Sequence, residues 1–402
     1  MFSRVALAFT GIAVPTGAAL GADSYVQPIL ELRAVSSSNL DLDPVTNSES
    51  DTYGAIANLS ALFGIATPQS TTSILPRLRL QEYADREAVE PVEGSLDFRS
   101  TYRAERSEFE LFAKYSYRDS YTAELADAEF DPLDPGDPTT PETGINTIGE
   151  TRQRFDFRPE FTRDVSERTR IGAGLQYQGV RYSSEAALNR VDYDYGRAGA
   201  FIGWAIAPRR SFAIGGYASK YEAKNFLNES DAYGATLAFS QQWSETAETR
   251  FEVGYESNDI VSDAIPLGES TSNFGANLTS TWEGEVSEWR LTAGRTFTPT
   301  GRGGKSITDQ LRIQYDRQLS ERLWLRGAAR YLSDESLSDA GSGGNRDYGR
   351  LEFSLQWYMT PTWFIGGGYH YTYQDREIDP EAADDNRFFL SVNYRGLGRE
   401  RR

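Results

Sequence analysis

The segment from Arg154 to Phe161 carries charged side chains in a regular pattern that could do chemistry. Charged residues occupy its even positions, and three phenylalanines stand at odd positions between them. Opposed arginines and carboxylates that line a pore create a transverse field, which orders water and admits polar solutes such as sugars. The same side chains could instead form salt bridges that fill and stiffen a closed interior. The residue types leave both interpretations open.

The same alternation recurs along the chain and gives a set of candidate pore-lining residues. Each shares one face of an expected strand with polar neighbours, while apolar residues occupy the opposite face. The set is Arg77, Arg79, Asp97, Arg99, Arg103, Glu108, Glu110, Arg154, Asp156, Arg158, Glu160, Arg250, Glu252, Arg312, Asp316, Arg326, Arg330, Arg350, Glu352 and His370.

His370 is the only histidine of the chain, so a catalytic Ser–His or Asp–His pair would have to use it. Its expected place is near the middle of a strand, on the same face as Thr372 and Gln374. Catalytic sites of barrel enzymes usually sit at the outer rim, so we interpret His370 as a polar residue of the lumen wall. Carboxylates are abundant but show no specific glycosidase arrangement. The sequence therefore predicts no enzymatic activity.

The longest polar connection is Asp119–Thr151, which contains nine acidic residues and no Lys or Arg. It could fold inward as a constriction. It could bind Ca²⁺ through Asp131, Asp134 and Asp137 around the turn residue Gly136. It could also be a disordered surface loop, which its composition favours.

The run from Gly303 to Ser306 imitates the end of a phosphate-binding loop. The earlier glycine of that motif would fall at Pro299, and the run is expected to join two strands rather than a strand and a helix. We interpret it as a glycine-rich surface turn and the one basic external connection. We expect no metal ion and no cofactor.

The elements that position these side chains are predicted to be long β-strands. A helix would scatter the phenylalanines near Phe155 around its surface, whereas a strand puts them on one face. A soluble β-sandwich also alternates in this way. The alternating runs last about 10 to 14 residues, however, which suits a tilted strand that crosses a bilayer, and soluble strands average nearer 5 or 6.

The connections between the strands alternate between short and long. Short turns are predicted at 104–106, 164–168, 207–210, 244–246, 283–285, 319–322 and 359–362. Longer connections lie between them, most of them acidic. The turns and strands repeat about every 35 to 45 residues, a length that overlaps the repeat of a β-propeller blade. A blade needs four short strands in that length, whereas only two long strands fit here, so the repeating unit is a hairpin. The prediction is an all-β, single antiparallel transmembrane β-barrel of about 18 strands (16–18), with short periplasmic turns and long acidic extracellular loops.

The tryptophans support this orientation. Six of the seven lie within a few residues of a predicted short turn, as an aromatic belt at the periplasmic interface requires. They are Trp243, Trp282, Trp289, Trp324, Trp357 and Trp363.

The composition excludes several other classes of protein. The hydrophobic content is 39%, low for a globular core, whereas aromatic residues reach 13% and cysteine is absent. A barrel with an apolar outer face and a polar lumen has this profile. The net charge of −18 argues against nucleic acid as a partner.

The N-terminus has the pattern of a secretory signal peptide. One arginine, Arg4, precedes an apolar run too short to cross a membrane, and small residues follow, with cleavage expected between Ala19 and Ala22. We therefore expect a signal peptide at 1–22, the barrel at 23–396 and a short tail at 397–402.

Three segments carry a resemblance to a known family. They are the opening strand Pro28–Arg33, the strand Leu75–Tyr83 and the charged alternation Leu96–Arg99. This pattern resembles the second family of outer-membrane β-barrel porins, often associated with exopolysaccharide systems. The resemblance implies an outer-membrane pore with a role in exporting a surface polymer. One departure is the tail Gly396–Arg402 after the last strand, because such barrels commonly end on an aromatic residue that the assembly machinery reads.

Three functions remain as hypotheses. The first is a conduit for an exported surface polysaccharide, the second a general or sugar-selective diffusion porin, and the third a non-conducting structural or adhesive barrel. The expected partners are outer-membrane lipid and lipopolysaccharide, the barrel-assembly machinery and, for the first hypothesis, a polysaccharide. The sequence predicts no oligomeric state.

Overall fold

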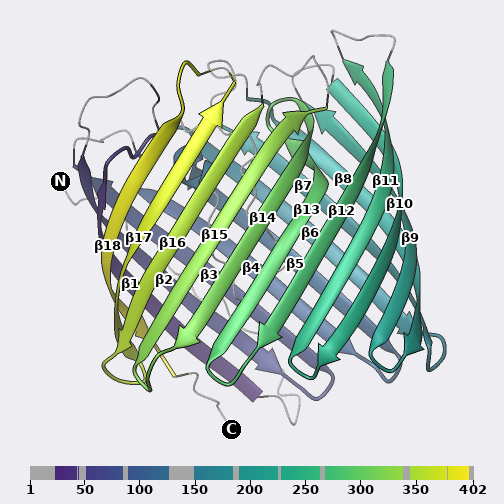
Figure 1. Cartoon of the computed structure of the whole chain (residues 1–402), viewed down its shortest axis with the longest axis horizontal. Coiled ribbons are helices and arrows are strands. Elements are labelled where there is room, and N and C mark those ends of the chain that lie inside the picture. Colours follow the sequence, from purple (N-terminus) through teal and green to yellow (C-terminus); the bar gives the residue numbers. More distant parts are fainter. Residues whose placement is uncertain are drawn as a thin grey trace.

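The computed structural model describes residues 23–42, 44, 51–84, 89–125, 149–183, 190–224, 228–262, 268–337, 345–377 and 379–397. In this part of the chain, 18 antiparallel strands form one sheet in which each strand pairs with its neighbours in sequence, and β1 also pairs with β18. The sheet is therefore a closed barrel (Figure 1). The predicted fold class is confirmed.

The strands have the following bounds: β1 (Asp23–Ser37), β2 (Thr52–Ala66), β3 (Ser70–Tyr83), β4 (Val92–Arg103), β5 (Ser107–Asp119), β6 (Thr151–Asp164), β7 (Thr169–Tyr182), β8 (Tyr193–Ala207), β9 (Arg210–Ala223), β10 (Asn228–Ser244), β11 (Ala247–Ser262), β12 (Glu269–Glu283), β13 (Ser287–Thr300), β14 (Gly304–Gln318), β15 (Leu323–Ser336), β16 (Arg346–Tyr358), β17 (Trp363–Arg376) and β18 (Ala383–Arg395). Their number agrees with the predicted count of about 18. One short helix, α1 (Ser120–Glu124), follows β5. No helix among the described residues is long and apolar enough to cross a membrane.

The seam between β1 and β18 removes the two free edges of the sheet. Its register runs from Ile29 opposite Arg395 to Ser37 opposite Arg387. At one end of the seam, the buried carboxylate of Asp385 accepts a hydrogen bond of 2.7 Å from Ser37 Oγ. Closure pairs the backbone groups of both edge strands, which a membrane interior requires.

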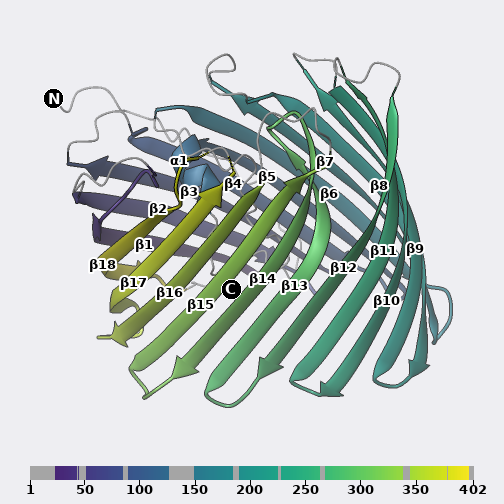
Figure 2. The same cartoon turned by 45° about the horizontal axis from the view of Figure 1, so that its top comes forward.

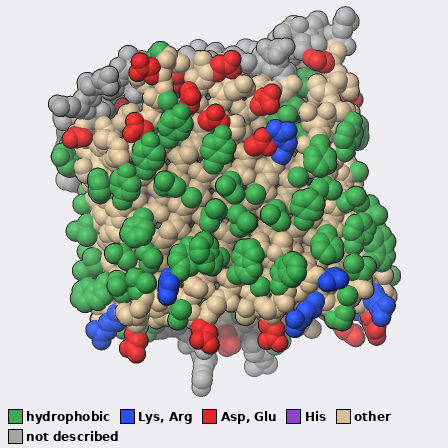
Figure 3. All heavy atoms as spheres, in the orientation of Figure 1, with side chains coloured by type: hydrophobic (Ala, Val, Ile, Leu, Met, Phe, Trp, Pro, Cys, Tyr) green, Lys and Arg blue, Asp and Glu red, His purple; other side chains and the backbone are tan. Residues whose placement is uncertain are grey.

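The outer face of the wall is apolar and the inner face is charged. On β6, Phe157 is 36% exposed, whereas its neighbour Asp156 is 2% exposed. Hydrophobic side chains cover the visible wall between acidic residues at one rim and mixed charges at the other (Figure 3). A closed sheet with a lipid-compatible outer face is the architecture of an outer-membrane β-barrel.

The two ends of the barrel differ in their connections. The eight connections at the short-turn end, such as 104–106 and 165–168, all have two to four residues. The other nine lie at the long-loop end, and all but 224–227 and 301–303 are longer. A recurrent Ser or Thr side chain stabilises several of the short turns. The hydroxyls of Ser166, Ser320 and Thr360 each accept a hydrogen bond from the backbone N–H three residues later, at 3.0–3.2 Å.

The predicted tryptophan belt lies at the short-turn end. The register places Trp282 opposite Trp289 on the outer face, two adjacent members of this belt. Trp324 is an exception, because it shares the strand face of Arg326, which bonds to Asp316 in the lumen. Alternation therefore places this one tryptophan on the inner side of the rim.

Side chains are packed inside the barrel at the long-loop end. The largest fully buried side chains, which include Tyr121, Tyr193, Tyr221 and Tyr348, all belong to strand ends or connections on that side. Figure 2, with the top turned forward, shows α1 within this mouth of the barrel. The interior is thus filled at one end, and the charged wall continues toward the other.

Candidate pore and constriction

The structure places all twenty predicted pore-lining residues on the inner face of the wall. They share strand faces with buried polar residues and alternate with the exposed apolar ones. Seven are buried, and these are Asp97, Asp156, Arg312, Arg330, Arg350, Glu352 and His370. Their position suits a pore lining, and their role in transport remains a proposal.

Many of these residues form ion pairs along the wall. The partners lie two residues apart on one strand or on adjacent strands, so each pair is held by the backbone register. The pairs are Arg77 with Asp97, Arg103 with Glu108 (2.5 Å), Arg154 with Asp156 (2.7 Å), Arg250 with Glu252 (3.1 Å), Arg326 with Asp316 (2.5 Å) and Arg350 with Glu352. The salt bridges expected by one of the two interpretations are therefore present, and a role of these residues in transport stays a prediction.

Three arginines form a row across adjacent strands. Arg312 on β14 lies opposite Arg330 on β15, which lies opposite Arg350 on β16, and all three are buried. Like charges directly opposite each other are unfavourable in a sheet, and Glu352 pairs with Arg350 at one end of the row. His370 is beside this row, with Nδ1 3.1 Å from Arg350 Nη2.

A cavity of about 1260 Å³ occupies the lumen beside β4 to β11. It exists because many inward-facing residues there are small, as Gly174, Gly199 and Ala238 illustrate. Its lining includes Arg106 and Arg168 in the short turns, so the cavity reaches the short-turn end. This half of the barrel has room for water and small solutes.

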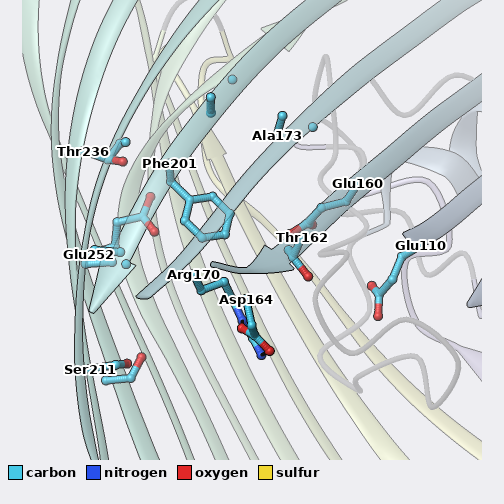
Figure 4. Close-up of a pocket in the computed structure, with 18 of the residues that line it drawn as sticks. Glu110, Glu160, Thr162, Asp164, Arg170, Ala173, Phe201, Ser211, Thr236 and Glu252 are labelled. Atoms are coloured by element: carbon cyan, nitrogen blue, oxygen red, sulfur yellow. Dashed lines mark hydrogen bonds and ion pairs between the residues drawn. The ribbon is translucent and has the colours of Figure 1, made fainter. Parts of the chain in front are cut away.

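Charged and aromatic side chains surround this cavity. Figure 4 shows Phe201 between Glu110 on one side and Glu252 on the other, with Arg170 against Asp164 below them. Arg170 Nε donates a hydrogen bond of 2.7 Å to Asp164. The cavity also includes Arg197, whose guanidinium lies 3.6 Å from the ring centre of Tyr217.

Sequence reasoning missed several residues of the lumen. Arg152, Arg170 and Arg197 were not among the predicted set, although each follows the alternation of its strand. Glycines and alanines around Arg170 and Arg197, and the polar Thr151 and Gln153 beside Arg152, weaken the apolar signal on the opposite face. Extending the alternation of inward and outward side chains from the clearer segments of the same strands would have identified these three arginines.

The connection after β5 folds into the lumen in its described parts. Asp119 caps α1 by accepting a hydrogen bond of 2.8 Å from the backbone N–H of Tyr121, and every residue of α1 is buried. The composition favoured a disordered surface loop, and that prediction is wrong for residues 119–125 and 149–151. Asp131, Asp134 and Asp137, the predicted calcium ligands, lie outside the described residues.

Residues from several sides of the barrel hold α1. Arg387 on β18 donates a hydrogen bond of 2.7 Å to the hydroxyl of Tyr121. Glu124 contacts Arg152 on β6 at 3.5 Å and Arg346 on β16 at 4.0 Å. Since β6 and β16 are eight places apart round a ring of 18 strands, Glu124 joins nearly opposite sides of the barrel.

The connection between β13 and β14 also folds inward. The carbonyl of Gly301 accepts a hydrogen bond of 2.8 Å from Val191, and Tyr221 on β9 donates one of 3.1 Å to the carbonyl of Thr300. Gly303 has a φ of 93°, which favours glycine at this turn. Lys305 is buried and its ammonium donates to Asn258 on β11 at 3.0 Å. The prediction of a surface turn is therefore wrong.

Burial shifts the pKa of two groups in these inward connections. It raises the pKa of the Asp119 carboxyl, against the effect of the three backbone N–H groups that donate to it. Burial, with the positive charge of Arg346 nearby, lowers the pKa of Arg302 to about 10. Both charges are thus held in a poorly solvated part of the lumen.

The described residues contain no group of three or more His, Asp or Glu side chains that could hold a metal ion. The prediction of no metal site stays a prediction.

The comparisons with known proteins add similar barrel structures. No protein-family model and no curated protein matches the sequence, so the resemblance to the exopolysaccharide-associated porins gains no support. The outer membrane protein OpdK from Pseudomonas aeruginosa is 11% identical, with a TM-score of 0.47 over 94% of this chain and 99% of that one. OpdQ from the same organism is 10% identical, with a TM-score of 0.46 over 92% and 99%. OccAB3 from Acinetobacter baumannii gives the same values. By its own closed sheet, apolar wall and charged interior, the chain is an outer-membrane β-barrel of 18 strands.

Proposed function

We propose that this barrel is a passive diffusion channel for small polar solutes, with a preference for anions. The observation that carries the proposal is the cavity of about 1260 Å³ that reaches the short-turn end. Ligand pockets of ordinary size occupy about 300–1,000 Å³, so the space suits a small solute with its water. The wall of the cavity is charged, and the cavity opens at the short-turn end, which would face the periplasm, as a diffusion path requires.

The preference for anions follows from the arginines. The row of Arg312, Arg330 and Arg350 lies on the inner wall, and seven of the charged residues around the cavity are arginines, against five carboxylates. A positive potential inside a narrow lumen raises the local concentration of anions. The formal charge of the whole chain, −18, is therefore a poor guide to its selectivity.

The packed long-loop end favours a channel that opens and closes over one that is always open. In this conformation α1 and the β13–β14 connection occupy the lumen. A polysaccharide conduit would need a wide, continuous path, so this packing does not favour polymer export. A structural barrel would account for the packing but leaves the charged cavity unexplained.

Single-channel recording in planar bilayers tests the proposal. Asp119 and Thr151 are paired across β5 and β6, so a two-residue turn can replace residues 120–150 without disturbing the strands. We expect brief openings from the intact protein and a steady, anion-selective conductance from the shortened variant. A steady conductance from the intact protein would mean that α1 does not close the pore. Silence from both proteins would overturn the proposal and leave a structural barrel.

A further inference from the structure

The outer halves of β12 and β13 do not pair with each other, although the two strands are neighbours in the barrel and both are fully described. Pairing between them ends at Ala276 opposite Arg295. Beyond that point β12 still pairs with β11, and β13 still pairs with β14 to its end. Residues 269–275 and 296–300 therefore each have a free strand edge on the side turned toward the other strand.

The outer end of the β13–β14 hairpin is held inside the lumen instead. Figure 2 shows it turning away from β12 into the mouth of the barrel. Lys305 is buried, and its ammonium donates hydrogen bonds to Ser219 on β9 at 3.1 Å and to Asn258 on β11 at 3.0 Å. The hydroxyl of Tyr221, also on β9, donates to the carbonyl of Thr300 at 3.1 Å. These contacts bind the hairpin to strands that are not its neighbours in the sheet.

The docking site of this hairpin contains buried polar atoms that make no hydrogen bond in the described part of the chain. They are Nδ2 of Asn258, Oγ of Ser230 and Oγ1 of Thr271. Asn258 is fully buried and lies opposite Thr271 in the β11–β12 register. Ser230 lies opposite Ile260, two residues further along β11. Buried polar groups without partners raise the free energy of the conformation that contains them. This penalty is relieved if the hairpin leaves and water reaches these atoms.

The sequences of the two free edges suit a completed wall. Continuing the existing register by three pairs gives Gly275 with Thr296, Phe274 with Phe297 and Asn273 with Thr298. The phenylalanines would then share the outer face, where Phe274 is already 58% exposed, and the third pair would face the lumen. Aromatic cross-strand pairs stabilise a sheet. Pro299 has no backbone N–H and would end the added pairing. The docked hairpin leaves this favourable pairing unused.

We propose that the outer half of the β13–β14 hairpin is a gate that switches between two sets of partners. In the docked state, Lys305 and Thr300 bind β9 and β11 across the mouth, and the lumen is narrowed. In the second state, β13 pairs with the free edge of β12, the wall is complete, and the hairpin leaves the lumen. The effect on transport rests on the proposed channel function, whereas the switch of strand pairing can be measured without any conductance.

Engineered cysteines report the second pairing, because the chain has no cysteine of its own. Asn273→Cys with Thr298→Cys brings the two thiols opposite each other when β13 joins β12. A disulfide needs Cβ atoms about 3.5–4.5 Å apart, a separation that opposed strand residues approach. The reference pair is Ala276→Cys with Arg295→Cys, which is already opposed in this structure and should cross-link rapidly. Under mild oxidation of the intact protein in detergent micelles, we expect the pair at 273 and 298 to react more slowly but to completion.

Weakening the docked state should speed this cross-linking. Lys305→Met removes the ammonium that binds Ser219 and Asn258, so the second state gains population and the rate should rise about tenfold. The matched control is Lys114→Met, which removes another buried lysine of the inner wall, on β5, and should leave the rate unchanged. Equal rates in the two methionine variants would overturn the switch. So would a pair at 273 and 298 that stays reduced while the reference pair reacts.

Single-channel recording of the intact protein then tests the gate. Cross-linking the pair at 273 and 298 should raise the fraction of time spent open at least about threefold, and reduction of the disulfide should reverse the change. If the cross-link forms and responds to Lys305→Met but no protein conducts, the strand switch stands and the channel function fails. If the protein conducts equally before and after cross-linking, the channel function stands and the gate fails.

Discussion

The guanidinium of Arg387, on β18, donates a hydrogen bond of 2.7 Å to the hydroxyl of Tyr121, which lies 266 residues earlier in the chain. Tyr121 is completely buried, and burial raises the pKa of its hydroxyl above the usual range, so the group stays protonated. This contact ties α1 to the wall beside the seam. It makes Tyr121 one of the anchors of the helix.

Replacing Tyr121 should loosen α1 without unfolding the barrel. Tyr121→Ala removes a buried aromatic side chain, at a cost of about 3–5 kcal/mol to the docking of α1. Tyr121→Phe removes only the hydroxyl and with it one of the acceptors of Arg387, which keeps its bond to Asp385, so the cost should be smaller, about 0.5–1.5 kcal/mol. Hydrogen–deuterium exchange of residues 119–125 should speed up in that order. The exposed Tyr233→Phe is the control, and unchanged exchange in Tyr121→Ala would contradict this role.

The docking of α1 should strengthen on mild acidification. Burial raises the pKa of Asp119, and the nearby Glu93 raises it further. A folded-state pKa above the unfolded one gives stability that is full below the ordinary Asp value near 3.8 and is lost as the pH rises through the raised pKa. Exchange at α1 should therefore slow as the pH falls from 7 toward 4, after correction for the intrinsic rate. Asp119→Asn, which can still cap the helix, should show a smaller change. Identical pH profiles would rule out Asp119 as the source.

The arginine row should control charge selectivity. Arg330→Gln removes the central charge of the row, and we expect the anion-to-cation permeability ratio to fall roughly three- to tenfold, which corresponds to about 0.7–1.4 kcal/mol. Reversal potentials in a salt gradient measure this ratio. Arg163→Gln makes the same charge change on the outer side of β6 and should leave the ratio unaltered. A ratio insensitive to Arg330 would place selectivity elsewhere.

The cavity should determine the conductance of the open state. A Cβ on Gly174 would meet its nearest neighbour, the carbonyl oxygen of Pro159, at 3.5 Å, so Gly174→Leu can be accommodated and projects into the lumen. We expect a lower unit conductance for this variant in the background without residues 120–150. The control is Ala198→Leu on β8, which lies opposite the exposed Leu175 on the outer face and should conduct as the parent does. Equal conductances would show that the current avoids this cavity.

The outer wall should respond to charge as a lipid-facing surface. Phe157 lies at the middle of β6, and Phe157→Arg should destabilise the barrel by about 2–4 kcal/mol. Urea unfolding in lipid vesicles measures this change. The neighbouring inward position provides the contrast, because Arg158→Lys keeps its charge in the lumen and should cost much less. A small effect at Phe157 would argue against a bilayer around β6.

The strands, and the face of each strand that lines the lumen, could be predicted from residues close together in the chain. The alternation around Phe155 and Asp156 reflects the two faces of a single strand, and that local signal repeats 18 times with turns between. The predicted lumen residues follow from the same rule, since the pairing of Arg154 with Asp156 needs only the two-residue period of a strand. The same two-residue period would have placed Trp324 on the inner face with Arg326 and excluded it from the outer tryptophan belt.

The contents of the lumen were decided by the tertiary structure. The composition of Asp119–Thr151 favoured disorder because its own residues offer no cations. Arg387 and Arg346 supply them from distant strands, and Arg190 supplies another from the β7–β8 connection. The segment around Lys305 was predicted to be a surface turn because its partners are distant in the chain. They are Ser219 on β9 and Asn258 on β11. Local alternation determines which face of a strand meets lipid. Only closure of the ring brings side chains from opposite walls close enough to hold a connection inside.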